Sequence, residues 1–348
     1  MKKIGKVILW MICIIVVVGG IVAWQYYSTF QMNNVRSDGG IVKIYRNMSN
    51  SEAEKAIIES GALINNKSFG KALKIMIKKG TIEPGLYQLK KGMNNKLIVR
   101  TLVNGWQTPT NLVISGYIRS RERLAAILGS KLEADSVSFI TALNNETLME
   151  SYGFNNDTYL GMIIPNTYEV YWTITPVDLL DRMKKEYDNF WNEERVEKAN
   201  LIGLSKDQVS TLAAIVIEES KYVPEQPTIA GVYMNRLKKG MPLQADPTVK
   251  FAINDPKVKR ILQKHLQIDS PYNTYKYKGL PPGPITIPPV SALDAVLNYE
   301  HHNYIYFCAK ATFDGQHNFA SSYSQHLQNA RAYQRAFTER EKLKASAQ

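Results

Sequence analysis

The sequence has few cysteines, few histidines and a single long apolar run. Its two cysteines lie in an apolar segment (Cys13) and in a strand-like run (Cys308), so we expect no disulfide between them. None of the five histidines forms a His-x₃-His pair on a clear helix beside an acid, so we predict neither a metal site nor a cofactor. A zinc enzyme stays an alternative that chelator insensitivity would exclude, with these candidate ligands: His301, His302, His317 and His326.

The chain also lacks an arginine-rich arm, internal repeats and low-complexity tracts. The net charge of +12 suits an anionic partner, but the basic residues are scattered in short doublets, so we predict no binding to nucleic acid. Hydrophobic residues make up 45% of the 348 residues, and charged residues make up 21%. This composition indicates a globular chain that is long enough for two modest domains.

The one long apolar run extends from Val7 to Trp24 and is about eighteen residues long, the lower end of the range that crosses a bilayer. Three lysines precede it and aromatic residues end it: Lys2, Lys3, Lys6, Trp24, Tyr26 and Tyr27. These flanks predict a single-pass anchor in the cytoplasmic membrane, with a cytoplasmic N-terminus and the remaining chain outside. The alternative is a cleaved signal peptide, but the nearest cleavage site, Ile21-Val22-Ala23, has a bulky residue where a small one is preferred.

Beyond this segment (residues 1–28) and a polar linker (29–40), the patterns predict two α+β domains. Residues 41–107 alternate as strand, helix, helix and strand, with the strands at Ile41–Tyr45 and Leu86–Leu89. This βααβ order resembles the LysM-like module that binds N-acetyl sugars, although a supporting module without ligand is the alternative. Residues 108–348 mix short strands with helices, including a helix after Thr175 and a charged C-terminal helix.

The most informative stretch begins at Ser205, which forms a Ser-x-x-Gln capping box with Gln208. An apolar stripe follows at helical spacing: Val209, Leu212, Ala213 and Val216. At about 100° per residue, Glu219 falls on the flank of this stripe and Glu218 falls nearly opposite it. We therefore expect Glu219 to be partly buried and Glu218 to face water.

Partial burial in an apolar wall raises the pKa of a carboxyl group, and a carboxylic acid that stays protonated near neutral pH can protonate a leaving oxygen. Glycosidic cleavage needs such an acid, so Glu219 is the candidate catalytic residue. The structural alternative is a boundary glutamate that is paired with a lysine or an arginine.

Polar and aromatic residues suited to sugar hydroxyl and acetamido groups follow this helix. A second helix, from Pro227 to Lys239, carries Asn235, and two loops follow it. We predict Asp246 first as a helix cap, since Asp-Pro-Thr favours that role. The candidate substrate-binding residues are Asn235, Gln244, Asp246, Thr248, Tyr272, Asn273 and Tyr275.

Several ordered motifs between Thr108 and His326 resemble those of the endolytic murein transglycosylase (YceG-like) family. They are Leu212–Ser220, Gly231–Leu237, Gly240–Val249, Tyr272–Tyr275, Gly279–Ile285, Tyr306-Phe307, Gly315–Phe319 and His326. The family's catalytic glutamate matches Glu219, and its earlier motif glutamate is Ile217 here. Where the family usually has Asn-Pro-Gly after Ile285, this chain has Ile287-Pro288-Pro289, which leaves the shape of that loop open.

The resemblance implies a membrane-anchored lytic transglycosylase that acts on peptidoglycan glycan strands. Glu219 would protonate the glycosidic oxygen between N-acetylmuramic acid and N-acetylglucosamine, and would then deprotonate the muramyl C6 hydroxyl to give a 1,6-anhydro end. It also implies that the chain ends growing strands near peptidoglycan synthases in the same membrane. The alternatives are a hydrolytic muramidase, which would need a second carboxylate such as Asp246, and a non-catalytic peptidoglycan-binding protein.

Overall fold

The chain divides into two compact units, and helices predominate in both. The first unit comprises Met1–Leu112, Lys131–Ala134 and Tyr168–Ile174, and the second comprises Val113–Ser130, Asp135–Thr167 and Thr175–Gln348. The computed structural model describes residues 2–78, 80–255, 257–258 and 260–346. Helices and short two-stranded sheets occur together, which confirms the predicted α+β class.

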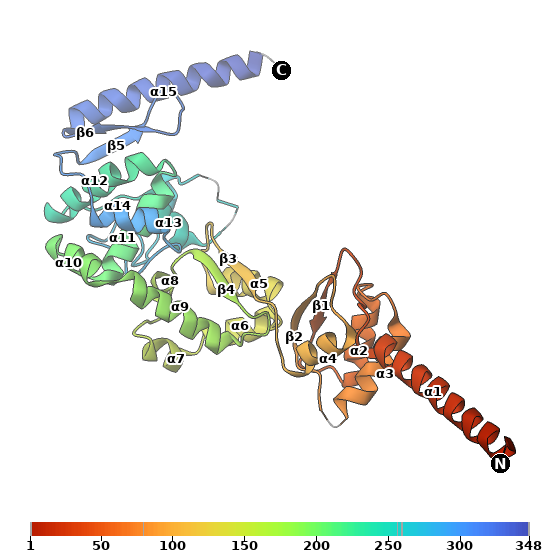
Figure 1. The fold of residues 1–348 in the computed structure, drawn as a ribbon. Helices are drawn as coiled ribbons and strands as arrows, with labels where there is room; N and C mark the ends of the chain where they lie inside the picture. Colours follow the sequence, from red (N-terminus) through yellow and green to blue (C-terminus); the bar gives the residue numbers. More distant parts are fainter. Residues whose placement is uncertain (1, 79, 256, 259, 347–348) are drawn as a thin grey trace. The chain divides into compact units, whose positions relative to one another are not determined.

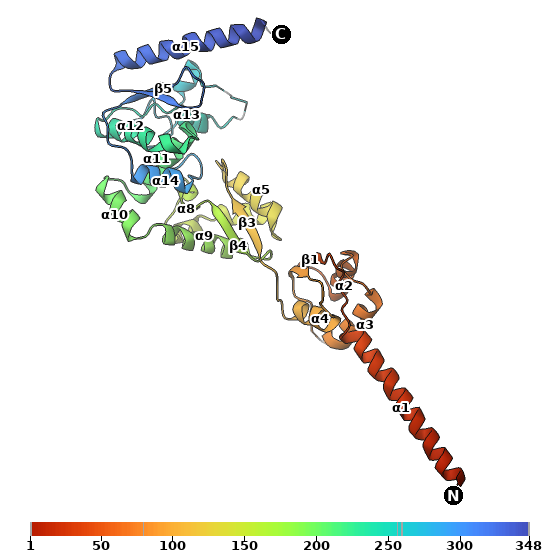
Figure 2. The same ribbon diagram turned by 45° about the horizontal axis from the view of Figure 1, so that its top comes forward.

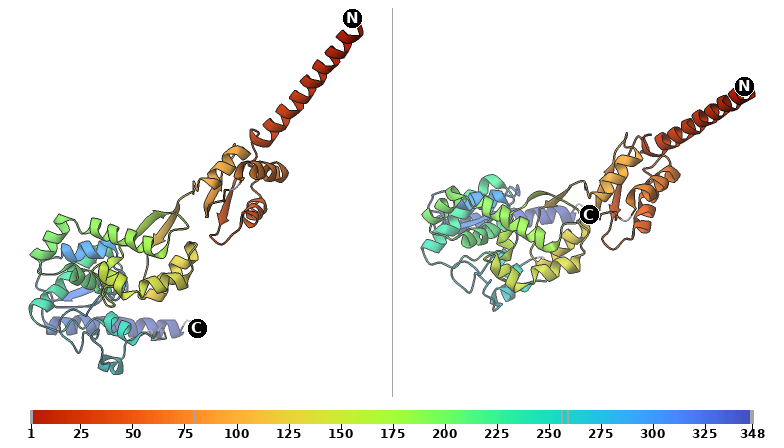
Figure 3. Two further views of the ribbon diagram at one scale, coloured as in Figure 1. Left: turned by 90° about the horizontal axis from the view of Figure 1, so that it is seen from below. Right: turned by 60° about the horizontal axis from the view of Figure 1, so that its bottom comes forward.

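The first unit opens with α1 (Lys2–Phe30), a single straight helix (Figure 3). Its stretch Ile4–Phe30 is long and apolar enough to cross a membrane, and none of its most apolar window is buried against the protein. The side chains of an isolated apolar helix would be exposed to water, so α1 fits a single-pass membrane anchor. Cys13 lies on this helix, and both it and Cys308 are free thiols, as expected.

A small βααβ module follows α1, in the order that the sequence predicts. It consists of β1 (Gly40–Ile44), α2 (Asn50–Glu59), α3 (Asn66–Ile77) and β2 (Gly85–Leu89), with α4 (Asn95–Val103) behind them. The two strands pair antiparallel, with Val42 opposite Tyr87. Side-chain oxygens of Ser49, Asn65 and Asn94 cap the helices, and the three helices and two strands enclose one hydrophobic core.

Two strands, β3 (Thr110–Ile114) and β4 (Asn166–Val170), run side by side as a two-stranded sheet (Figure 2). Between and after them come the helices α5 (Arg121–Lys131), α6 (Ser136–Leu143), α7 (Glu146–Ser151), α8 (Tyr159–Met162), α9 (Pro176–Phe190) and α10 (Glu193–Leu201). Thr175 caps α9 through the backbone N–H of Asp178, as predicted.

The second unit is built around α11 (Lys206–Glu219), which begins at the predicted Ser205–Gln208 capping box. Helices α8, α10, α12 (Gln226–Lys238), α13 (Asp246–Ile253) and α14 (Val290–Leu297) pack around it (Figure 1). All residues from Val209 to Val216 are therefore buried, a wider surface than the predicted stripe. Small residues permit this packing: a Cβ atom on Gly161 of α8 would lie 3.2 Å from Cβ of Ser210.

The C-terminal part of the second unit is a hairpin of β5 (Tyr306–Ala309) and β6 (His317–Ala320), followed by α15 (Tyr323–Ser346). The strands pair antiparallel, with Phe307 opposite Phe319. Helix α15 packs against both strands (Figure 1). The predicted charged C-terminal helix is confirmed, and its first turn faces the same pocket as the end of α11.

Candidate active site

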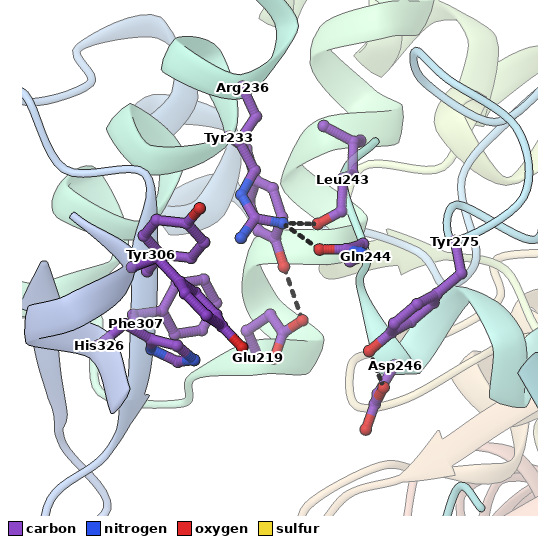
Figure 4. A pocket seen from close by; sticks show the side chains of 11 residues that line it. Glu219, Tyr233, Arg236, Leu243, Gln244, Asp246, Tyr275, Tyr306, Phe307 and His326 are labelled. Atoms are coloured by element: carbon purple, nitrogen blue, oxygen red, sulfur yellow. Dashed lines mark hydrogen bonds between the residues drawn. The ribbon is translucent and has the colours of Figure 1, made fainter. Parts of the chain in front are cut away.

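Glu219 is the last residue of α11 and lies at the wall of a pocket in the second unit. The backbone turns to an extended conformation at Ser220, so the helix ends where its side chain reaches the pocket. Glu219 is intermediate in exposure, and its side chain lies among those that line the pocket (Figure 4). This agrees with the partial burial that the helical spacing predicts.

The Tyr233 hydroxyl, on the buried face of α12, donates a hydrogen bond to Oε1 of Glu219 at 2.7 Å. Burial raises the pKa of Glu219 from 4.5 to about 7, the hydrogen bond from Tyr233 lowers it, and the charges of Asp246 and Glu218 raise it. A substantial fraction of the Glu219 carboxyl groups is therefore protonated at neutral pH. This is the condition for a general acid that can also act as a base.

The pocket has a volume of about 340 Å³ and gathers side chains from several elements (Figure 4). Residues from α11, α12, α13 and the loop before it, the loop that carries Tyr275, the hairpin and α15 line it: Glu219, Tyr233, Arg236, Leu243, Gln244, Asp246, Tyr275, Tyr306, Phe307, Tyr323 and His326. Acidic, amide and hydroxyl groups face aromatic rings across this space. Such a mixture suits a sugar, which offers hydroxyl groups at its edge and C–H groups on its faces.

Arg236 holds the loop that forms one side of the pocket. Its guanidinium group donates hydrogen bonds to the carbonyl oxygens of Leu243 and Ile305, both at 2.7 Å, and it lies over the ring of Tyr306. It also reaches the side-chain oxygen of Gln244, whose backbone has a left-handed φ of 51°. A glutamine seldom adopts that conformation, so these hydrogen bonds maintain a strained residue at the pocket wall.

Three of the seven predicted substrate-binding residues line the pocket with Glu219: Gln244, Asp246 and Tyr275. The Tyr275 hydroxyl donates to Oδ1 of Asp246 at 2.6 Å. Asp246 does not cap α13 as expected, because Ala245 occupies the N-cap position and makes no side-chain hydrogen bond there. Asp246 is instead the first helical residue, and its carboxylate is available to the pocket.

Two other predicted substrate-binding residues, Asn235 and Tyr272, make hydrogen bonds within the protein and do not line the pocket. The Asn235 amide donates to the carbonyl oxygens of His302 and Tyr304, which joins α12 to the segment before β5. The Tyr272 hydroxyl donates to Oδ1 of Asp157 at 3.0 Å. In this conformation both side chains support the scaffold around the site.

The last two predicted contacts, Thr248 and Asn273, are fully buried. The Thr248 hydroxyl lies 2.9 Å from that of Thr274, while the Asn273 amide donates to the carbonyl oxygens of Leu266 and Ile268. The first bond connects α13 to the loop that carries Tyr275, and the bonds of Asn273 hold that loop in place. Thr248 and Asn273 therefore shape the pocket from behind its lining.

The expectation that Glu218 faces water is wrong. Its side chain is only 7% exposed, and the Arg119 guanidinium donates two hydrogen bonds to its carboxylate oxygens, at 2.8 and 2.5 Å. Helical periodicity places Glu218 opposite the stripe correctly, but that side of α11 is covered as well. The boundary glutamate paired with an arginine is therefore Glu218, while Glu219 has no such partner among the described residues.

Sequence reasoning did not predict that several pocket residues contact the substrate: Tyr233, Arg236, Leu243, Tyr306, Phe307, Tyr323 and His326. Tyr233 and Arg236 are three residues apart, so they share one face of α12, a spacing that could have indicated them. Tyr306, Phe307 and His326 belong to the motifs noted above, but only tertiary packing brings them to Glu219.

Histidines and acids do not assemble into a candidate metal centre within the described residues. Nδ1 of His317 instead lies 2.8 Å from Oε2 of the buried Glu225, and the backbone N–H of His317 donates to Oε1 of the same residue. His302 lies 2.9 Å from the carbonyl oxygen of Thr228. These contacts give both histidines structural partners.

Comparison with known proteins places this architecture in one family. The model of the YceG-like family matches residues 42–332, which is most of the chain. This chain belongs to the YceG-like family. The crystal structure of a YceG-like protein from Listeria monocytogenes is similar to it, with a TM-score of 0.56 and 25% sequence identity over 84% of this chain and 99% of that one.

Curated relatives from two species carry the name endolytic murein transglycosylase. The Bacillus subtilis protein is 31% identical over 260 residues, 70% of this chain and 71% of its own length. The Streptococcus pneumoniae protein is 26% identical over 282 residues, 71% of this chain but only 50% of its own length. This YceG-like chain therefore matches about half of the pneumococcal relative.

Proposed function

We propose that this member of the YceG-like family cuts glycan strands of peptidoglycan internally, between N-acetylmuramic acid and N-acetylglucosamine. Its enzyme class, lytic murein transglycosylase, rests on the family and on the names of its relatives. One observation carries the proposal: the carboxyl group of Glu219 has a pKa of about 7 and lies in a pocket lined by polar and aromatic side chains.

In the first step, protonated Glu219 gives its proton to the glycosidic oxygen. The bond between that oxygen and muramyl C1 breaks, and the N-acetylglucosamine side leaves as an alcohol. In the second step, the Glu219 carboxylate takes the proton of the muramyl C6 hydroxyl while the C6 oxygen bonds to C1. Glu219 is restored, no water is consumed, and the product is a 1,6-anhydro end.

The surrounding side chains have matching tasks in this proposal. The Tyr233 hydroxyl stabilises the carboxylate form of Glu219 between the two steps, because it donates to Oε1. Gln244, Asp246 and Tyr275 contact hydroxyl or acetamido groups of the sugars. Asn235, Thr248, Tyr272 and Asn273 do not contact the sugars in this proposal. Their hydrogen bonds hold the segments around the pocket in place.

Digestion of purified sacculi tests the role of Glu219. A Glu219→Gln variant keeps an acceptor for Tyr233 but has no proton to give, so it should release no soluble fragments. The adjacent Glu218→Gln variant is the matched control, because glutamine can still accept from Arg119, and it should retain activity. If Glu219→Gln digests sacculi as well as the wild type, cleavage does not need Glu219 and the proposal fails.

A hydrolytic muramidase is the second candidate, and the position of Asp246 favours it. Asp246 lines the same pocket as Glu219, and its charge raises the pKa of Glu219. A hydrolase would use such a carboxylate to activate water or to form a glycosyl intermediate. Product mass distinguishes the two reactions, because the anhydro fragment lacks one water.

We further propose that α1 anchors the enzyme in the cytoplasmic membrane, with its lysines on the cytoplasmic side and the chain beyond α1 outside. Residues 41–107 would be a LysM-like module that binds N-acetyl sugars, and residues 108–348 the catalytic domain. This arrangement would place the pocket where synthases extend new strands, and cleavage there would end their elongation. Protease added outside intact cells should remove the catalytic domain if this orientation is correct.

A further inference from the structure

Helices α3 and α4 carry positive charges and no acidic residue. Their five cations define a basic face: Lys67, Lys71, Lys74, Lys96 and Arg100. Helix α2 of the same module differs, because it holds three acids: Glu52, Glu54 and Glu59. The two helices that contact α1, α3 and α4, therefore carry cations without acids among them.

The end of α1 is fixed on the first turns of α3 and α4. The Asn95 amide of α4 donates to the carbonyl oxygen of Thr29 at 2.8 Å and to Oγ of Ser68 on α3 at 3.0 Å. Its own oxygen accepts from the Asn34 amide at 2.6 Å. Asn95 and Thr29 are both buried. The module therefore packs directly against the end of α1 (Figure 3).

This junction lies close to where the membrane surface would be. Trp24, Tyr26 and Tyr27 are exposed on α1 and mark the level of an aromatic belt. Thr29 is two residues beyond Tyr27, about 3 Å further along the helix axis. Charges within about 8–10 Å of a membrane feel its surface potential at physiological salt, so the first turns of α3 and α4 fall in range.

The residues around this junction are both cationic and apolar. Lys71 is three residues after Ser68 and Ile75 is seven residues after it, so all three lie on one face of α3. Ile75 is exposed, as is Leu97 beside Asn95 on α4. Within the described residues, no member of the basic face forms a salt bridge, so their charges are available to a ligand.

We propose that the basic face binds the headgroups of anionic phospholipids in the leaflet where α1 leaves the membrane. The lysines attract the phosphates, and the exposed Ile75 and Leu97 enter the headgroup boundary. The contact keeps the βααβ module against the membrane surface. This inference rests on the membrane anchoring proposed above and is independent of the catalytic activity.

Chemical labelling of lysines in the full-length protein tests the inference. The protein is reconstituted in nanodiscs of phosphatidylcholine, with or without phosphatidylglycerol, and acetylation rates are read by mass spectrometry. Lys67 and Lys71 should react about fivefold more slowly in the anionic discs, the factor expected from the usual attraction of one lysine to such a surface. Lys55 on α2 is the internal control and should react equally in both, and high salt should remove the difference.

Variants separate the basic face from general charge. Replacing Lys67, Lys71 and Lys74 by glutamine should reduce the phosphatidylglycerol that co-purifies with the protein, whereas replacing Lys55, Lys185 and Lys342 should not. Equal acetylation rates in both discs, or equal protection of Lys55, would overturn the proposal. So would equal protection by a soluble polyphosphate in neutral discs, because the face would then bind anionic polymers. Flotation with vesicles checks the anchor separately, since all variants should still float.

Discussion

Replacing Glu219 by glutamine should make the folded protein more stable at alkaline pH while it abolishes activity. Burial raises the pKa of Glu219 from 4.5 to about 7, so above pH 7 the folded state must hold a carboxylate that burial disfavours. The difference corresponds to a cost of about 3 kcal/mol to the wild-type protein at pH 8. Glutamine carries no charge and avoids this cost.

The sign follows from proton binding. Near pH 4 the carboxyl group is largely protonated in both states, so it affects stability little. Between pH 4.5 and 7 the folded state binds more protons than the unfolded state, so the stability of the wild type falls as pH rises. The stability advantage of Glu219→Gln should therefore grow by roughly 2–3 kcal/mol between pH 5 and pH 8.

Urea titrations of the full-length proteins in detergent, followed by tryptophan fluorescence, measure this advantage. Trp191 is buried in the second unit, and the tryptophans of the first unit contribute equally to both proteins. Glu339→Gln is the matched control, because Glu339 is exposed on α15 and its replacement should give a difference that does not change with pH. A Glu219→Gln advantage equally independent of pH would refute the reasoning, since Glu219 would then be ionised as in water.

Three further substitutions test residues in and around the site. Tyr233→Phe removes the hydrogen bond that lowers the pKa of Glu219, so the alkaline limb of the kcat/KM profile should move to higher pH while kcat falls. Asp246→Asn removes a charge that raises that pKa, so the limb should move to lower pH; complete loss of activity would instead indicate a hydrolase with two carboxylates. Glu225→Ala leaves the backbone N–H of His317 without its buried acceptor, and calorimetry should show a stability loss of about 2 kcal/mol.

Local patterns in the sequence were sufficient for most elements of the fold. The Ser205–Gln208 capping box and the Thr175 cap predicted the starts of α11 and α9, because capping depends on residues three positions apart. The βααβ order followed from alternating apolar periods in the same way. Helical spacing also placed Glu219 at the edge of a buried surface, although it could not show that α11 is covered on every side.

Tertiary contacts decided what local patterns could not. Glu218 pairs with Arg119, a residue 99 positions away, so no local rule indicates that it is buried. Thr248 and Asn273 have the chemistry of sugar ligands, but their side chains bond to neighbouring loops. The role of Tyr233 is likewise not readable from its own helix, because its hydroxyl reaches Glu219 only through the packing of α11 on α12.

Cleavage of glycan strands in heavy-oxygen water, with mass spectrometry of the fragments, tests the central claim most directly. If Glu219 directs the muramyl C6 hydroxyl to C1, the wild-type fragments should lack one water and contain no heavy oxygen, and Glu219→Gln should release none. Fragments that carry heavy oxygen at a reducing end would contradict the account, because water would then be the nucleophile.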